Sequence, residues 1–221
     1  MQNFDTPAPI TVVLDVPAGR VQFIAADRAD TAVEVLPANP SKGRDVKAAE
    51  QAKIEYVDGV LRIEMPAKNQ VFGAPGSVEV TIQLPTNSRI EAKAAATEFR
   101  AVGRLGDVAF EGAYGQIKVD EAAQARIAAV AGDVVIGRLT GSAEISTSKG
   151  DIRIDEATGG TVTLSTQAGD VSIGAAHGVS ASLDAGTAYG RIRNALKNTD
   201  GAAELTIHAT TAYGDIDARS L

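Results

Sequence analysis

The sequence contains no cysteine and no tryptophan, and only 4% of its 221 residues are aromatic. Without cysteine, disulfide bonds and thiolate metal sites are excluded, so the fold depends on packing alone. The 21 Lys and Arg residues are outnumbered by 28 Asp and Glu residues, which gives a net charge of -7. A chain of this charge lacks the basic surface that binds phosphate backbones, and we expect no nucleic acid partner.

Long apolar runs are also missing. No stretch approaches the roughly 18 residues that a membrane span needs, and residues 1–7 lack the basic and apolar regions of a signal peptide. We therefore expect no membrane span and, for the chain as written, a cytoplasmic location. The apolar content, 44%, consists mainly of Ala, Val, Ile and Leu, which is typical of a core built from small and β-branched side chains.

What the sequence does have is an internal repeat, Gly-Asp-Ile/Val-x-Ile/Val. The repeat strands begin at Gly115, Gly132, Gly150, Gly169, Gly190 and Gly214, with spacings of 17, 18, 19, 21 and 24 residues. A second set of alternating strands lies between them, centred on Ile127, Ile145, Leu164, Leu183 and Ile207. Repeats of this length predict an all-β fold, a single-chain parallel β-solenoid of about six to seven two-strand rungs over residues 88–221.

The two strand sets also predict local detail. From the central residue of the second set to the next glycine there are five residues in the first three repeats, but seven after Leu183 and Ile207. This difference predicts two extra residues in each of the last two corners. Strand alternation places Ile152 in the core and Arg153 outside.

Residues 1–87 predict an antiparallel β layer that caps one end of the repeats. Strands are expected at 10–16, 21–25, 32–36 and 77–84, with a hairpin through Asp58-Gly59 and a short helix or loop at 43–52. The chain ends directly after the last repeat strand. We therefore expect unpaired strand edges at 203–210 and 214–218.

Two segments match the form Thr-x-x-Gly-Asp-Val/Ile-x-Val/Ile best, namely 147–154 and 166–173, and Leu84–Ala92 is similar to an entry into such repeats. On these residues the chain resembles a bacterial β-strand-repeat family of unknown function, the DUF4097 family, whose members are often labelled adhesins. The resemblance covers nearly the whole chain and implies no catalytic residue. It also implies that a cell-surface location is allowed if the N-terminus has been trimmed.

The outward aspartates of the repeat form the first candidate site, comprising Asp133, Asp151, Asp170 and Asp215. Stacked carboxylates could coordinate Ca²⁺. Alternatively, an Asp after a glycine corner accepts backbone N–H groups, an interpretation favoured because Gln116 and Arg191 interrupt the column. We treat the column as a weak metal candidate and expect no cofactor.

The tripeptide Ala-Tyr-Gly recurs around Tyr114, Tyr189 and Tyr213, the last two in neighbouring repeats. Their rings could hold a sugar or a partner protein, or they could cover the long corners. Arg191 and Arg193 are expected to pair with Asp215 and Asp217. The candidate interaction residues are Tyr189, Arg191, Tyr213 and Ile216.

Three functions fit this pattern. The preferred one is a non-enzymatic scaffold or interaction module that binds a protein partner or associates with itself through its open C-terminal rung. The alternative, which the family resemblance implies, is adhesin-like binding of an envelope glycan or polymer. The third, a polysaccharide hydrolase or lyase, is disfavoured because the outward columns of Asp, Ser, Thr, Lys and Ala form no convergent cluster. In addition, no Ser/His/Asp arrangement can be argued from His177 and His208.

The face assignment makes a direct prediction. Ile152→Asp should place a charge in the core and unfold the repeats, whereas Arg153→Asp should change stability by less than about 0.5 kcal/mol. Thermal unfolding of the two variants checks this. Equal melting temperatures would contradict the assignment.

Overall fold

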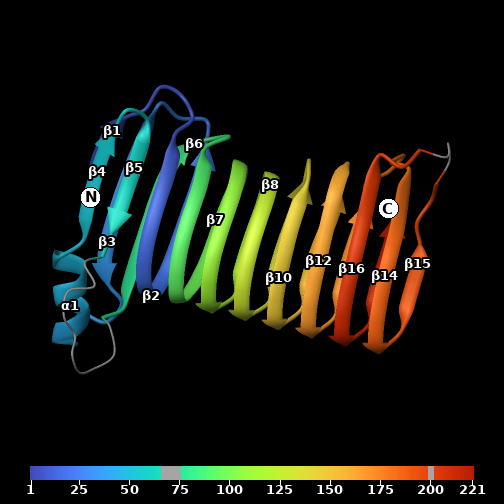
Figure 1. Ribbon diagram of the computed structural model, residues 1–221. Coiled ribbons are helices and arrows are strands. Elements are labelled where there is room, and N and C mark those ends of the chain that lie inside the picture. Colours follow the sequence, from blue (N-terminus) through green and yellow to red (C-terminus); the bar gives the residue numbers. More distant parts are fainter. Residues whose placement is uncertain (66–75, 199–201) are drawn as a thin grey trace. The chain divides into compact units, whose positions relative to one another are not determined.

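The computed structural model describes residues 1–65, 76–198 and 202–221, and the chain forms two compact units, Met1–Gly115 and Gln116–Leu221 (Figure 1). Nearly all regular structure in both units is β-strand, so the predicted all-β repeat fold is confirmed. The expected boundary between residues 87 and 88 stays a prediction.

The first unit combines parallel and antiparallel strands. Its elements are β1 (Gln2–Asp5), β2 (Thr11–Ala26), β3 (Asp30–Pro37), α1 (Gly43–Glu50), β4 (Lys53–Val57), β5 (Val60–Glu64), β6 (Val78–Pro85) and β7 (Arg89–Tyr114). The pairs β1–β3, β3–β6 and β4–β5 are antiparallel, as the sequence predicted. Strand β2, in contrast, runs parallel to β5, β6 and β7, because its long alternating stretch pairs with β7 as successive repeats do.

Two local predictions for this unit are confirmed. Asp58 and Gly59 both have positive φ, 49° and 77°, and they connect β4 to β5 as a two-residue hairpin turn. The segment at 43–52, expected to be a helix or a loop, forms the helix α1.

The second unit is built from parallel strands only, in every pairing that the structure describes. They are β8 (Ile117–Ala131), β9 (Val134–Leu139), β10 (Ala143–Lys149), β11 (Ile152–Ala157), β12 (Gly160–Ala168), β13 (Val171–Ala175), β14 (Ala181–Tyr189), β15 (Ile192–Ala195), β16 (Leu205–Tyr213) and β17 (Ile216–Ser220). We call a pair such as β12 and β13, joined at a glycine corner, a coil.

Alternate side chains of each coil point inward and form the core. Ile152 and Val171 pair across neighbouring coils and are at most 1% exposed, whereas Arg153 between Ile152 and Ile154 is exposed. Burying one such side chain contributes about 1.5–3 kcal/mol. The predicted inward and outward faces are therefore confirmed.

The coils do not stack in chain order. Strand β16 pairs with β12 on one side and with β14 on the other, and β17 lies in the same way between β13 and β15 (Figure 1). The last coil in the sequence, β16 and β17, therefore lies between the coil of β12 and β13 and the coil of β14 and β15. The predicted open edges at 203–210 and 214–218 are wrong, because both strands are paired on both sides; the end coil is β14 and β15.

The strand register corrects a second prediction. Leu164 pairs with Ala209, and Ala209 pairs with Ala185, so five residues still separate each of these from the following glycine. The last two corners are not lengthened, and the additional residues lie at the beginnings of the strands. A two-residue offset was hard to recognise from sequence because it leaves every side chain on the same face.

Glycine at the corner is required by the close approach of successive coils. A Cβ atom on Gly169 would lie 2.1 Å from the carbonyl oxygen of Gly150, and one on Gly214 would lie 2.0 Å from that of Gly169. Both residues have a φ of +154°, which side chains disfavour. The repeat glycine therefore sets how closely the backbones can stack.

Gly169→Ala should lower the free energy of unfolding by about 2–3 kcal/mol, because the methyl group meets fixed backbone and the φ angle is strained. The control is Gly186→Ala on β14, where an added Cβ meets nothing within 4 Å. Urea denaturation measures both. A Gly186 variant that is destabilised as much as the Gly169 variant would contradict the steric explanation.

Candidate functional site

The outward aspartates connect successive coils through their backbones. The Oδ1 atoms of Asp133, Asp151 and Asp170 accept the backbone N–H groups of Asp151, Asp170 and Asp215 at 3.0, 2.8 and 2.7 Å. Asp215 in turn accepts the N–H of Arg191 at 2.9 Å. These bonds agree with the backbone-acceptor interpretation. Among the described residues no group of three His, Cys, Asp or Glu side chains could hold a metal ion, and the cation site stays a prediction.

A threonine three residues before the glycine completes the corner. The Thr166 hydroxyl donates to the carbonyl oxygen of Gly150 at 3.1 Å, and the Thr211 hydroxyl donates to that of Gly169 at 3.0 Å. Thr187 repeats the contact in the end coil. The motif Thr-x-x-Gly-Asp thus contains one donor to the neighbouring coil, one residue without a side chain and one acceptor.

Arg191 and Asp215 attach the end coil to its neighbour. The Arg191 guanidinium donates to Asp215 Oδ2 from Nε and Nη2, at 3.2 and 3.0 Å. The pKa of Asp215 lies below its usual value, first because it accepts the Arg191 backbone N–H, and further because of the guanidinium and the charge of Arg193, while desolvation opposes the shift. The expected pairing of Arg191 with Asp215 is confirmed. Since the Arg191 side chain is 74% exposed and that of Asp215 is 35% exposed, the solvent-screened pair contributes little to global stability.

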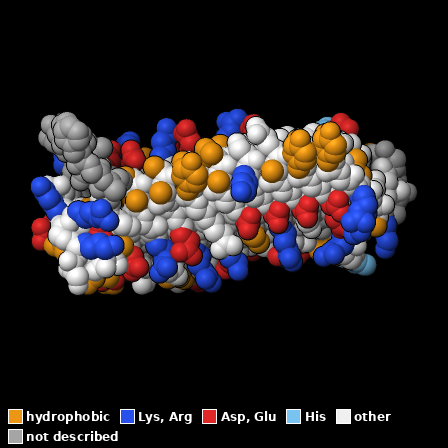
Figure 2. Space-filling model, turned by 90° about the horizontal axis from the view of Figure 1, so that it is seen from below, with side chains coloured by type: hydrophobic (Ala, Val, Ile, Leu, Met, Phe, Trp, Pro, Cys, Tyr) orange, Lys and Arg blue, Asp and Glu red, His pale blue; other side chains and the backbone are white. Residues whose placement is uncertain are grey.

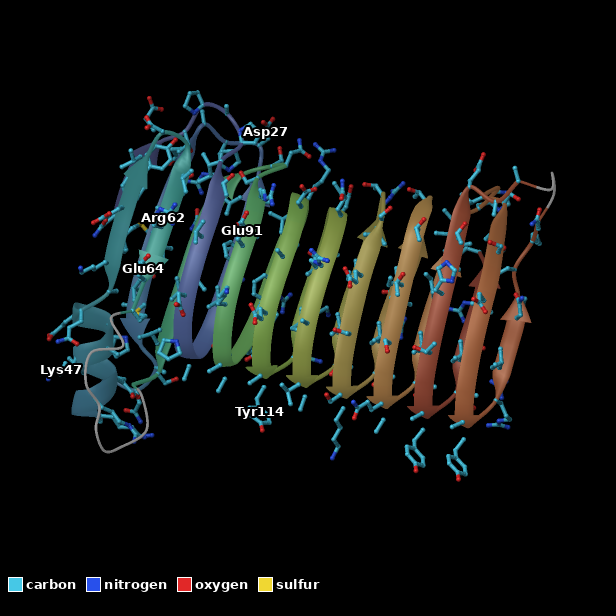
Figure 3. All side chains as sticks on the ribbon, viewed as in Figure 1. Asp27, Lys47, Arg62, Glu64, Glu91 and Tyr114 are labelled. Atoms are coloured by element: carbon cyan, nitrogen blue, oxygen red, sulfur yellow. The ribbon has the colours of Figure 1, made fainter. Side chains whose placement is uncertain are left out.

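Next to the aspartates lies a pair of stacked tyrosines. The ring centroids of Tyr189 and Tyr213 are 5.0 Å apart, the ring planes differ by 3°, and the residues are 68% and 61% exposed. Figure 2 shows orange side chains gathered beside a row of red ones. Tyr114, in the first unit, also points away from the strands (Figure 3). The structure therefore brings Tyr189, Tyr213 and Arg191 to one corner.

Ile216 does not belong to this surface. Its side chain is 0% exposed because β17 lies between β13 and β15 and directs Ile216 into the core. The prediction that Ile216 forms an exposed contact at an open rung is wrong.

The sequence pattern did not predict that apolar residues of the end coil are exposed. Ile192 is 45% exposed, although its register partner Ile216 is fully buried, and Leu183 is half-buried although its partner Ile207 is fully buried. Among the strands that the structure describes, none pairs with the outer edges of β14 and β15. The spacings of 21 and 24 residues in the last repeats were the available signal, since a connection that passes over a coil needs more residues.

The family can now be identified. The model of a family described as Toastrack DUF4097 matches residues 11–220. This chain belongs to the Toastrack DUF4097 family. The resemblance seen in the repeat motif is confirmed, and in this Toastrack chain the motif forms the stacked corner of Thr, Gly and Asp described above.

Three solved structures are similar to this chain. An adhesin candidate from Parabacteroides distasonis is 13% identical, with a TM-score of 0.51, and the match covers 98% of this chain and 95% of that one. A candidate lipid-binding protein from the same species is 10% identical with a TM-score of 0.46 and the same two coverages. A candidate cell adhesion protein from Clostridium sporogenes is 13% identical with a TM-score of 0.41, covering 100% of this chain and 98% of that one. The first of these supports the fold alone.

No protein of curated function matches this Toastrack chain. In the parts that the structure describes, no helix has the length and apolar content to cross a membrane.

The Arg191 contact predicts a measurable titration. Because the folded-state pKa of Asp215 is lowered, its stabilisation is present above the unfolded-state pKa and is lost as pH falls through the folded-state value. Arg191→Ala removes the guanidinium but keeps the backbone N–H, so the Asp215 pKa should rise only part of the way to its usual value. Arg193→Ala should raise it less. NMR titration of the carboxyl carbon measures both, and a larger rise in the Arg193 variant would contradict the order of causes.

Proposed function

We propose that this protein is a non-enzymatic binding module whose end coil, β14 and β15, pairs with the end coil of a second copy. One observation carries the proposal: within the described residues, the outer edges of these strands have no partner strand, and Ile192 is 45% exposed where its counterparts in inner coils are buried. An open strand edge beside an apolar face favours pairing with another strand.

The free edge is well defined. The backbone N–H of Ala181 donates to the carbonyl oxygen of Lys197, so the first residue of β14 is already engaged. The segment from Ser182 to Tyr189 follows it along the outer edge. Leu183 and Ile192 occupy positions that face the core in the inner coils, but in the end coil Leu183 is half-buried and Ile192 is exposed. The end coil of a second copy would cover both.

Charge favours one way of pairing two copies. The outward charge of β14 is Asp184, with a side chain 85% exposed, whereas β15 carries Arg193. The two strands run in opposite directions (Figure 1). A two-fold axis parallel to the strands therefore places β14 of each copy antiparallel to β15 of the other copy. In this arrangement Asp184 and Arg193, which have opposite charges, lie on the same shared sheet. Pairing β15 with β15 would instead place two arginines next to each other.

The other functions have different support. The hydrolase or lyase alternative has little, because the repeated aspartates are acceptors for backbone N–H groups and converge on no common point. Binding of a glycan would use another surface, the stacked tyrosines.

The end-coil pairing is tested with Ile192→Lys, which puts a charge on the exposed apolar face. We expect the wild type to form dimers and the variant to weaken them by at least about tenfold, or about 1.4 kcal/mol. Val130→Lys is the matched control, since Val130 is 47% exposed on β8, and it should dimerise as the wild type does. Analytical ultracentrifugation over a concentration series measures all three.

Two results would overturn the proposal. One is a wild type that stays monomeric at its highest soluble concentration. The other is a dimer that Ile192→Lys and Val130→Lys weaken equally.

A further inference from the structure

One ring face of Tyr213 is covered by a tyrosine, while the neighbour on the opposite face is only an alanine. In the strand register, Lys149, Ala168, Tyr213 and Tyr189 occupy the same position in four successive coils. Tyr189 stacks on one side of the Tyr213 ring at 5.0 Å. On the other side the residue is Ala168, whose methyl group is too short to cover a phenol ring. Tyr213, 61% exposed, therefore presents a flat apolar face toward the Ala168 coil.

The coil spacing sets the depth of the space beside this face of Tyr213. Parallel strands lie about 4.8 Å apart, which is close to the separation of the two tyrosine rings. A ring placed above Ala168 would lie one coil spacing from Tyr213, as a third ring in the stack. Lys149 is the next residue of the row and is exposed, so its ammonium group could donate to an oxygen on the far side of such a ring.

Carboxylates lie along the same corner. Asp151 and Asp170 follow two residues after Lys149 and Ala168, and both are exposed. Their Oδ1 atoms accept backbone N–H groups, while Oδ2 of each has no hydrogen bond among the contacts found in the described ranges. The corner therefore offers an aromatic face together with acceptors of fixed position.

We infer that the uncovered face of Tyr213 binds a neutral pyranose ring of a glycan, above Ala168, with sugar hydroxyls donating to Asp170 and Asp151. A pyranose has an apolar C–H face that can lie on an aromatic ring, and its hydroxyl groups are donors that a carboxylate accepts. The site uses the outer surface of the coils and does not depend on pairing between end coils.

The charges argue against anionic ligands. The row of Asp133, Asp151, Asp170 and Asp215 is negative, and the chain carries a net charge of -7. Nucleotides and acidic polymers would be repelled there, and Lys149 alone does not offset the row. A neutral sugar gains the stacking and the hydroxyl bonds without this repulsion.

The test uses three neutral hexasaccharides, cellohexaose, chitohexaose and maltohexaose, with an acidic hexagalacturonate for comparison. The chain has four tyrosines and no tryptophan, so tyrosine fluorescence reports on the site directly, with calorimetry as a second readout. We expect at least one neutral probe to bind and Tyr213→Ala to lower its affinity at least about tenfold. The matched control is Tyr114→Ala, since Tyr114 is 62% exposed in the same tripeptide, and it should bind as the wild type does.

Two further variants test the position of the ring without removing Tyr213. Ala168→Leu covers the open face and should lower affinity as strongly as Tyr213→Ala. Asp170→Asn keeps an oxygen for the backbone N–H of Asp215 but removes the charged acceptor, and it should lower affinity several-fold at unchanged melting temperature. Ile192→Lys, which weakens end-coil pairing, should leave sugar affinity unchanged, so the two proposals can fail separately.

The inference is overturned if no neutral probe binds, if hexagalacturonate alone binds, or if Tyr213→Ala or Ala168→Leu retains wild-type affinity. Circular dichroism verifies that each variant is folded.

Discussion

The close contact between backbones at the glycine corner is the constraint on which the second unit depends. The carbonyl oxygen of Gly150 lies where a side chain on Gly169 would begin, so only glycine allows the coils to approach to the spacing of paired strands. At that spacing Thr166 reaches the same carbonyl oxygen, and Asp151 reaches the N–H of the next coil. The recurrence of Thr, Gly and Asp at the corner follows from a distance between backbones.

Stacking at a fixed register turns single residues into rows. Tyr189 and Tyr213 have nearly parallel planes because their strands pair residue by residue, and the aspartates are aligned for the same reason. A change at one position of the row alters the surface of its neighbours. Ala168 acts in this way, since its small side chain leaves a face of Tyr213 uncovered. The surface at one register position thus depends on which residue types occupy that position in neighbouring coils.

The sequence predicted the features that depend on one coil at a time. Strand alternation identified Ile152 as core and Arg153 as surface, and Asp58-Gly59 located the hairpin. The stacking order could not be predicted, because every coil carries the same corner and the same apolar columns. No residue within a single coil distinguishes the position of β16 between β12 and β14 from a position after β14, and the longer spacings of the last two repeats were the one available signal. The exposure of Ile192 and the burial of Ile216 depend on that order.

Insertion of the last coil links the two proposed surfaces. Tyr213 belongs to β16 and Tyr189 to β14, and the inner position of the C-terminal coil places Tyr213 between Ala168 and Tyr189. The same insertion makes β14 and β15 the end of the stack, because β16 and β17 pair with their inner edges. Asp215 then lies where it accepts both the backbone and the guanidinium of Arg191. The position of β16 and β17 thus determines that β14 and β15 form the end coil.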